Sequence, residues 1–318
     1  MSATISEKKL VFVFPGQGAQ SVGMGHDFYQ HSPAARAIFE TVDDACGFSV
    51  SALCFEGPEE SLKETRNTQP CLYATSVAAY AACIEAGLTP AATAGHSVGE
   101  YAALHAAGVF DVATGAKLIK ARGEAMADAA RFRTGTMAAV LGLDDAIIAE
   151  VCERISADVD VVVIANRNAP GQTVISGETS AVEAAGVKLK EAGAKRIVPL
   201  SVSGAFHSPL MELAAIMLRG TLDNAEFSDP RIPIVANVTA DYQRKTSDIR
   251  LNLATQVAGP VRWVETIKLL YRDGYDTFVE CGPGTVLAGL IKRIAPEAKT
   301  YSVSDMASLN AAKEALNA

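Results

Sequence analysis

The 318-residue sequence lacks closely spaced cysteines and clustered histidines. Its six cysteines are scattered without a C-x-x-C spacing, which disfavours a disulfide framework and indicates reduced, mostly buried thiols in a cytoplasmic protein. The five histidines have no ligand spacing to one another or to a cysteine, so we expect no metal site. Lysine and arginine number 28 against 36 acidic residues. The resulting net charge of −8 disfavours a broad nucleic-acid surface.

No hydrophobic run has the character of a membrane span. The longest apolar region, residues 71–95, contains Glu85 and Pro90 and is rich in alanine, so it predicts a buried helix followed by a strand. The apolar residues 10–14 are too few for the core of a secretion signal, and the residues before them are charged. Hydrophobic residues make up 49% of the chain, enough for one large core or two unequal domains.

Nucleotide-binding glycine motifs are also absent. The apolar run from Leu10 to Phe14 predicts a buried strand of a parallel sheet, and residues 15–20 form the loop after it, where open α/β sheets bind ligands. The next glycine after Gly16 and Gly18 is Gly23, so the dinucleotide spacing fails, and no Gly-Lys-Ser/Thr follows. We interpret these glycines as allowing backbone N–H groups to approach a ligand, with an ordinary tight turn as the alternative.

The sequence does contain a G-x-S-x-G motif, residues 95–99, between a short apolar run and a helix-forming stretch. Strand, motif and helix in this order are typical of a nucleophile elbow. The elbow presents the hydroxyl of Ser97 on a tight, strained turn, where bulky residues in place of the glycines would clash. It also places the N–H of Val98 at a helix N-terminus, where it suits an oxyanion. A glycine-flanked serine in a surface turn is the simpler alternative.

Two further residues have the chemistry to join Ser97. Arg122 lies in a helix predicted from the Asp111 cap to about residue 130. Helical arginines are usually solvated, but the neighbouring Gly123 costs a helix about 1 kcal/mol and indicates close packing or ligand approach. His207 lies in a loop before a helix. Of the five histidines it alone belongs to a separate element that could fold over Ser97, and a solvated loop histidine is the alternative.

The order of elements predicts an α/β fold with an inserted second domain. Between residues 136 and 200 the pattern is βαββαβ, typical of a ferredoxin-like unit, with residues 166–171 expected as a loop. We therefore divide the chain into a large domain, residues 1–131 and 204–318, and a small domain, residues 132–203. Such an insertion leaves a cleft against its host. Further helices are expected at 33–46, 67–86, 248–258 and 261–271, and further strands at 234–237, 277–281 and 300–303.

These motifs together resemble the malonyl-CoA:acyl carrier protein transacylases of standalone bacterial fatty acid synthesis. The resemblance covers nearly the whole chain, in the right order and spacing. It rests on residues 14–20, 95–101, 120–123, 205–208, 237–239, 260–263 and 280–284, and on Gln256. The family fold, an α/β-hydrolase-like large domain with a parallel sheet and a ferredoxin-like small domain, agrees with the insertion described above.

The resemblance implies a role for each site residue. Ser97 would attack the thioester of malonyl-CoA, and His207 would take its proton and later return one to the leaving thiol. The backbone amides of Gln17 and Val98 would hold the oxyanion. Arg122 would pair with the malonyl carboxylate, for which the guanidinium fork is well suited.

The resemblance also implies that no acidic residue completes a triad, and that an acceptor near Gln256 orients the histidine. Phe206 would oppose an α-methyl branch on the acyl group, and one methyl is worth only about 1–3 kcal/mol of discrimination. Asn166 would contribute to substrate binding. Its neighbour Arg167 departs from the aromatic or apolar residue expected there, and we assign it no role.

The implied partners are malonyl-CoA and the phosphopantetheine of holo acyl carrier protein, with no bound cofactor, metal, nucleic acid or membrane, and with the chain as a cytoplasmic monomer. A trans-acting polyketide acyltransferase would share this chemistry. A serine esterase or thioesterase should show a triad acid between Ser97 and His207, but the candidate aspartates there lie in the small domain. A non-catalytic docking module predicts loss of the serine, histidine or arginine, and all three are present.

Overall fold

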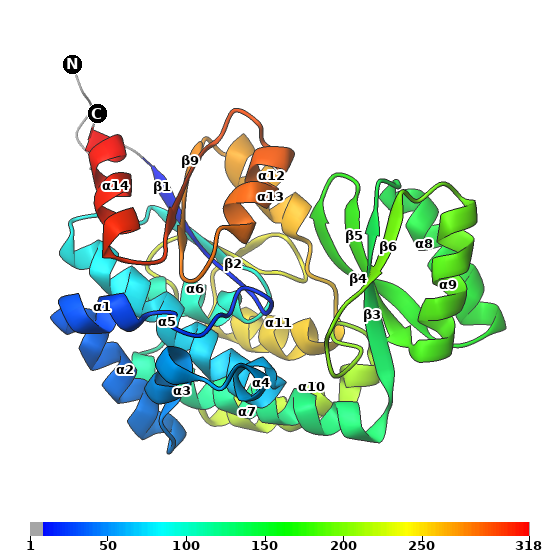
Figure 1. Cartoon of the computed structure of the whole chain (residues 1–318), viewed down its shortest axis with the longest axis horizontal. Coiled ribbons are helices and arrows are strands. Elements are labelled where there is room, and N and C mark those ends of the chain that lie inside the picture. Colours follow the sequence, from blue (N-terminus) through cyan, green and yellow to red (C-terminus); the bar gives the residue numbers. More distant parts are fainter. Residues whose placement is uncertain (1–8, 318) are drawn as a thin grey trace.

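The computed structural model describes residues 9–317, and residues 1–8, which include most of the charged N-terminal stretch, lie outside that part. Two separate sheets, each with its own helices, make up the described chain (Figure 1). The strands of the larger sheet are parallel except at one edge, and those of the smaller sheet are all antiparallel. The predicted α/β class with a second, ferredoxin-like unit is confirmed.

The large sheet has its most apolar strand near the middle. Its strands occur in the order β10 (Lys299–Val303), β9 (Thr277–Cys281), β1 (Leu10–Phe14), β2 (Ala92–Gly95), β7 (Ile234–Val235) and β8 (Tyr242–Gln243). Every residue of β1 is completely buried. Such a strand needs cover on both faces, which is the reason for its continuous apolar sequence.

Helices cover both faces of this sheet. Phe12 and Phe14 point to the larger face, and Val11 and Val13 point to the other face, where they meet Trp263. The core on the larger face includes residues of α1 (His26–His31), α2 (Pro33–Cys46), α3 (Val50–Glu56), α4 (Glu59–Lys63), α5 (Thr65–Glu85), α6 (Gly99–Ala106), α7 (Val112–Phe132), α10 (Glu212–Asn224), α11 (Thr246–Ala258) and α14 (Met306–Asn317). Of these, α5, α6 and α14 make the main contacts with the strands. The other face packs against α12 (Trp263–Arg272) and α13 (Val286–Ile294).

The small sheet follows α7 directly. Its strand order is β4 (Val162–Ala169), β5 (Gln172–Glu178), β3 (Gly135–Leu141) and β6 (Arg196–Pro199), the arrangement of a ferredoxin-like unit. Helices α8 (Asp145–Asp158) and α9 (Thr179–Glu191) share one core with Val140 and Ile175. On the opposite face, Met137 and Val174 belong to the core of the large unit. The chain then returns to the large unit through the short helix η2 (Pro209–Met211).

Several predicted boundaries were wrong. Residues 166–169, expected in a loop, continue strand β4, which carries two register irregularities and pairs with β5. The backbone of this segment also bonds to Val261, whose N–H donates to the carbonyl of Ala165 while its own carbonyl accepts from Arg167. Val261 is therefore outside α12, which begins at Trp263. The short elements α1, α3, α4 and β8, and the terminal α14, were not predicted.

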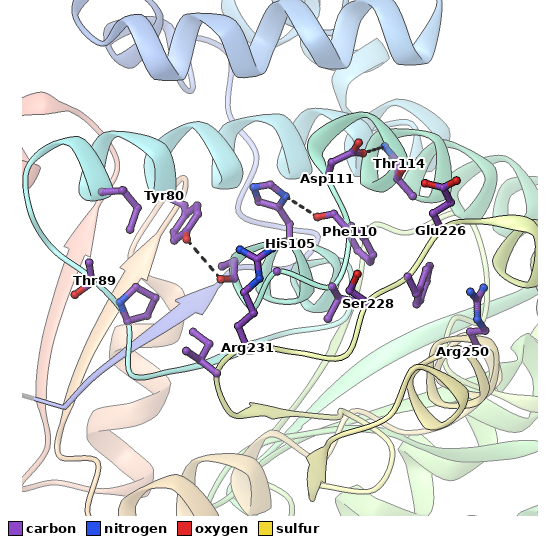
Figure 2. A pocket seen from close by; sticks show the side chains of 17 residues that line it. Tyr80, Thr89, His105, Phe110, Asp111, Thr114, Glu226, Ser228, Arg231 and Arg250 are labelled. Atoms are coloured by element: carbon purple, nitrogen blue, oxygen red, sulfur yellow. Dashed lines mark hydrogen bonds between the residues drawn. The ribbon is translucent and has the colours of Figure 1, made fainter.

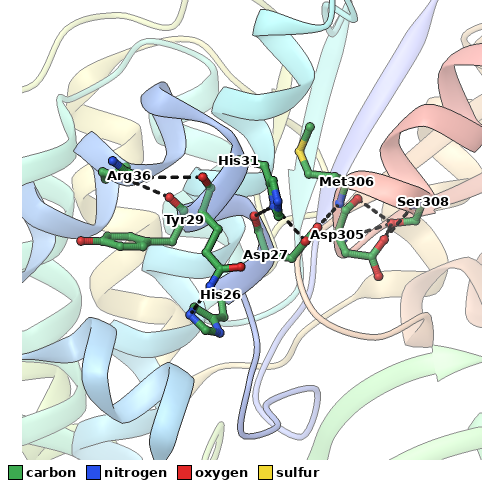
Figure 3. Close-up of polar contacts among 9 residues, drawn as sticks. His26, Asp27, Tyr29, His31, Arg36, Asp305, Met306 and Ser308 are labelled. Atoms are coloured by element: carbon green, nitrogen blue, oxygen red, sulfur yellow. Dashed lines mark hydrogen bonds and ion pairs between the residues drawn. The ribbon is translucent and has the colours of Figure 1, made fainter.

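The first and last helices are joined by polar contacts around α1 (Figure 3). Asp27 accepts a hydrogen bond from the backbone N–H of Met306 at 2.7 Å, and it forms an ion pair of 3.0 Å with His31. His26 stacks on Phe55 with ring centroids 4.8 Å apart. Both histidines are exposed. None of the helices within residues 9–317 is both long enough and apolar enough to cross a membrane.

The G-x-S-x-G turn joins β2 to α6 with no room for side chains at its two glycines. A Cβ on Gly95 would overlap the backbone of Gly99, and a Cβ on Gly99 would overlap the carbonyl group of Phe14 in the neighbouring strand. The φ of Ser97 is 53°, in the left-handed region that non-glycine residues rarely adopt. Backbone packing therefore holds the serine in a strained conformation.

We expect Gly99→Ala to lower the free energy of unfolding by about 1–3 kcal/mol, because the added methyl overpacks two backbone segments. Gly220→Ala is the matched control, since Gly220 is exposed on α10 and a Cβ there meets nothing. That change should stabilise the protein by up to about 1 kcal/mol, since alanine is the better helix former. Urea unfolding midpoints compare the two variants, and equal effects would contradict the packing argument.

Candidate active site

The side chain of Asn237, which follows β7, holds Ser97 in place through hydrogen bonds. The backbone N–H of Ser97 donates to the side-chain oxygen of Asn237 at 2.7 Å, and the side-chain nitrogen of Asn237 donates to the carbonyl of Gly95 at 2.6 Å. The buried side-chain amide of Asn237 thus holds the turn at two points, Gly95 and Ser97. These bonds help to offset the strain at Ser97, and they fix where its hydroxyl points.

His207 reaches Ser97 from the segment between the small sheet and η2. Its Nε2 lies 2.8 Å from the Oγ of Ser97. Its Nδ1 lies 2.8 Å from the main-chain carbonyl of Gln256 and 3.1 Å from that of Gly259. Carbonyl oxygens only accept hydrogen bonds, so Nδ1 carries the proton and Nε2 is free to accept from the serine. The orienting group that the resemblance implied near Gln256 corresponds to its backbone carbonyl.

The charge of the His207 ring follows from its surroundings. Burial, together with the positive charge of Arg122, lowers the pKa of His207 to about 3. The backbone hydrogen bond to Gln256 opposes this shift. The imidazole is consequently neutral near pH 7, which is the state in which it acts as a base toward a serine hydroxyl.

Arg122 lies on α7 with 1% of its surface exposed, so the alternative of a solvated helical arginine does not hold. Its guanidinium donates to the side-chain oxygens of Gln69 at 2.6 Å and Gln256 at 2.9 Å, and to Ser97 Oγ at 3.1 Å. Within residues 9–317 it forms no ion pair, and its Nε has no hydrogen-bond partner. A buried cation without a counter-ion, beside a nucleophile, suits an anionic ligand group.

Gly123 explains how this arginine becomes buried. A Cβ at Gly123 would lie 3.2 Å from Cα of Arg66 and from the carbonyl oxygen of Thr65, at the start of α5. Helices α5 and α7 therefore approach closely at this point, as the glycine indicated. The approach places Gln69 of α5 against the guanidinium. Gln69 had no assigned role from sequence, although a glutamine inside a largely buried alanine-rich helix was a signal of a polar contact.

Gln17 and Val98, whose backbone N–H groups were predicted to hold the oxyanion, line the same cavity as Ser97. Gln17 follows β1, and Val98 precedes the first residue of α6. Neither N–H donates a hydrogen bond to any described residue. Because unpaired N–H groups near a reacting carbonyl stabilise negative charge, this pair is suited to an oxyanion.

A cavity of about 390 Å³ connects these groups between the two sheets. Most of the residues predicted for the site line it, and Gln256 lies just beneath it. The lining includes Gln17, Ser97, Val98, Arg122, Met126, Met137, Asn166, Val202, Phe206 and His207. Asn166 and Phe206 are 6% and 5% exposed, so both are walls of the cavity and not surface groups. Asn166 reaches it from strand β4, in place of the predicted loop.

His96, next to the nucleophile, bonds the two units together. Its Nε2 lies 2.8 Å from the side-chain oxygen of Asn168 in β4, and its ring meets Trp263 edge-on with centroids 5.6 Å apart. Burial lowers the pKa of His96. We had assigned no role to His96 or Asn168, and their contact helps to set the distance between the elbow and the small sheet.

A wider hollow of about 970 Å³ lies at the other end of α6 and contains none of the predicted site residues (Figure 2). Its polar groups are largely satisfied within the fold. His105 Nδ1 lies 3.1 Å from the carbonyl of Phe110, Asp111 caps α7 by accepting from Thr114, and Arg250 donates to the carbonyls of Leu222 and Ala225. The smaller cavity, which brings the predicted residues together, is therefore the candidate active site.

We expect the His207 imidazole to stay neutral in the free protein at pH 5. The unfolded ring binds a proton near pH 6.5, so His207 also makes folding stability rise with pH between about 3 and 6.5. NMR of histidine-labelled protein, with His207→Gln to assign the signal, measures the titration directly. A midpoint near 6.5 for this signal would contradict the burial argument.

Comparison with known proteins agrees with this geometry. The model of the acyl transferase domain family matches residues 11–312. The malonyl CoA-acyl carrier protein transacylase of Bacillus subtilis is 43% identical, over 97% of each chain. That of Escherichia coli K12 is 42% identical, over 96% of this chain and 99% of the relative.

Solved structures show the same similarity. An acyl carrier protein S-malonyltransferase from Vibrio cholerae is 43% identical with a TM-score of 0.93, over 96% of this chain and all of the other. A malonyl transacylase solved in complex with its type II polyketide synthase acyl carrier protein is 41% identical, with the same TM-score, over 97% of this chain and all of the other. The extent of these matches leads to one conclusion: this chain belongs to the acyl transferase domain family, alongside the malonyl CoA-acyl carrier protein transacylases.

Proposed function

We propose that this chain transfers the malonyl group from malonyl-CoA to the phosphopantetheine thiol of an acyl carrier protein, through a malonyl ester on Ser97. The observation that carries the proposal is the Ser97–His207 pair with the buried, uncompensated Arg122 guanidinium beside it. The pair can form an acyl-serine, and the guanidinium selects an acyl group that ends in a carboxylate. The names of the relatives support the same substrate and acceptor.

In the first half-reaction the Ser97 oxygen attacks the thioester carbonyl. The hydroxyl proton passes to Nε2 of His207, which lies 2.8 Å away. The Nδ1–H of the same ring continues to donate to the carbonyl of Gln256. The carbonyl oxygen becomes an oxyanion held by the N–H groups of Gln17 and Val98. The tetrahedral adduct then collapses, the C–S bond breaks, and the CoA sulfur takes the proton from His207.

In the second half-reaction the same groups act in reverse order. The thiol of the carrier-bound phosphopantetheine gives its proton to His207 and attacks the ester carbonyl. The oxyanion accepts hydrogen bonds from the same two N–H groups. The Ser97 oxygen then leaves and takes the proton from His207. Because CoA departs before the carrier protein reacts, the scheme gives ping-pong kinetics. The protein's own groups carry out every step, so the scheme involves no bound metal or cofactor.

Arg122 binds the far end of the acyl group. In the free protein one guanidinium nitrogen donates to Ser97 Oγ, and a malonyl carboxylate would replace that bond with a stronger charged one. A neutral acetyl group would leave the guanidinium unpaired in the cavity. Phe206 and Asn166 complete the wall around the acyl chain, where the ring of Phe206 would oppose an α-methyl branch.

The alternatives differ in what surrounds His207 and in which carrier protein is used. An esterase triad would place a carboxylate on Nδ1, whereas main-chain carbonyls hold it here. A polyketide acyltransferase would use the same residues. Sequence identity does not separate the two, because it is 41% with the malonyl transacylase solved with a polyketide synthase carrier protein and 43% with the Vibrio cholerae S-malonyltransferase. The preferred carrier protein separates these two.

We further propose that the chain is a cytoplasmic monomer. Its two domains would be residues 1–131 with 204–318, and residues 132–203.

We expect the intact mass of the protein to rise by one malonyl group when it is mixed with malonyl-CoA alone. Holo acyl carrier protein should then remove the label, and Ser97→Ala should acquire none because it lacks the attacking oxygen. Release of CoA without a retained acyl group would identify a hydrolase. Stable labelling of Ser97→Ala would place the nucleophile elsewhere.

We expect Arg122→Ala to lower kcat/KM for malonyl-CoA by about 30-fold to several thousand-fold, since loss of a desolvated charge pair costs roughly 2–5 kcal/mol. Activity with acetyl-CoA should rise relative to malonyl-CoA, because the uncompensated charge is gone. Lys117→Ala, an exposed change on the same helix, is the control and should leave both activities unchanged. An unaltered malonyl preference in Arg122→Ala would remove Arg122 from the acyl pocket.

A further inference from the structure

Beneath the site lies a carboxylate that the reaction scheme does not use. Glu100 is on α6, three residues after the nucleophile, and none of its surface is exposed. Its Oε2 accepts from Nε2 of Gln256 at 2.7 Å and from the backbone N–H of Asn237 at 3.2 Å, and its Oε1 accepts from Nε2 of Gln243 at 2.8 Å. All three partners are N–H donors, so the group is placed as an acceptor only.

The contact with Gln256 fixes which way that amide points. Nε2 of Gln256 donates to Glu100 and, at 3.0 Å, to the carbonyl of Ser97, so its Oε1 faces Arg122. In the reversed orientation Oε1 would face two acceptors, and the NH₂ group would face the guanidinium donors. A carboxylate at position 100 therefore decides that Gln256 offers Arg122 an acceptor.

The contact with Asn237 fixes the elbow. Glu100 accepts from the backbone N–H of Asn237, whose side chain in turn accepts from the N–H of Ser97 and donates to the carbonyl of Gly95. On the far side, Gln243 is itself held by Asn252, which donates to it at 3.0 Å. Glu100 thus joins α6, the segment after β7, strand β8 and α11 at one point.

The charges support the same connection. Arg122 has no ion-pair partner among residues 9–317, and Glu100 is separated from it by a single amide, that of Gln256. Burial raises the pKa of Glu100 to about 7, and the hydrogen bonds from Gln256 and Asn237 and the charge of Arg122 act in the opposite direction. The donors around Glu100 and the charge of Arg122 therefore favour its carboxylate form, which lies one amide away from the guanidinium and not in contact with it.

We propose that Glu100 is a positioning residue for acyl-group selection: through Gln256 it holds the Arg122 guanidinium, and through Asn237 it holds Ser97, so that a carboxylated acyl group is favoured over a neutral one. This inference rests on the proposed function, and in particular on Arg122 as the binding group for the acyl carboxylate. Glu100 acts through these residues and touches no reacting atom.

The test compares Glu100→Gln with Glu280→Gln. Glu280 is also buried, with 1% of its surface exposed, but its carboxylate accepts from the backbone N–H groups of Leu287 and Ala288 at the start of α13. For each variant, kcat/KM for acyl-enzyme formation is measured by mass with malonyl-CoA and with acetyl-CoA on one preparation. The ratio of the two values is independent of how much of the preparation is folded.

We expect the malonyl-to-acetyl ratio to fall about tenfold or more in Glu100→Gln, because a buried hydrogen-bond network to a charged group is broken. The ratio in Glu280→Gln should match the wild type. If Glu100 matters only for stability, both substrates lose activity by the same factor, the ratio is unchanged, and the proposal is overturned.

Two further variants separate the possible failures. Gln256→Met removes the amide that links Glu100 to Arg122, and it should lower the malonyl-to-acetyl ratio by a similar factor. This variant keeps the proposal testable if Glu100→Gln does not fold. Adding Glu100→Gln to Arg122→Ala should change the ratio no further, since coupled residues are non-additive. A wild type that forms no malonyl ester would refute the proposed function itself, whereas a normal wild type with an unchanged ratio in both variants refutes the role of Glu100 alone.

Discussion

The cost of burying the Arg122 guanidinium next to Ser97 constrains the whole site. A charge with 1% exposure needs hydrogen-bond acceptors, and the fold supplies one from α5, the side-chain oxygen of Gln69, and one from α11, that of Gln256. Neither acceptor carries a charge, so the guanidinium keeps its attraction for an incoming anion. A carboxylate in direct contact would occupy the place that we propose for the malonyl group.

The same charge explains the choice of groups around His207. A positive neighbour and burial both lower its pKa, so the ring remains a neutral base without help from an acidic residue. Two main-chain carbonyls suffice to fix its tautomer. Because these carbonyls belong to α11 and the turn that follows, the helix that supports Arg122 through Gln256 also orients the base. Base and anion site are therefore positioned by one segment of chain.

The cavity exists because two sheets meet. The large unit provides the nucleophile, the base and the arginine, and the small sheet provides a wall with Met137 and Asn166. Contacts between His96 and Asn168, and between Val261 and β4, hold the units together next to the nucleophile. An acyl-serine in such a space is covered on several sides, and this favours transfer to a delivered thiol over reaction with bulk water.

Local patterns in the sequence were enough for the features that depend on local physics. The apolar run of β1, the helix at residues 33–46, the elbow between two glycines and the βαββαβ order all appear in the structure as predicted. Asn166 was misplaced because its polar neighbours look like a loop, while pairing with β5 and Val261 stabilises a strand.

The sequence by itself determined the α/β class, the elbow and the residue types available for chemistry, since these follow from periodicity, turn geometry and spacing. The tertiary structure alone decided that Arg122 is buried, that His207 faces Ser97 at 2.8 Å, and that Glu100 and Asn237 lie beneath the nucleophile. The contacts of Ser97 with Arg122, His207, Asn237 and Gln256 join residues from 25 to 159 positions apart, and their geometry comes from how the elements pack and not from any local pattern.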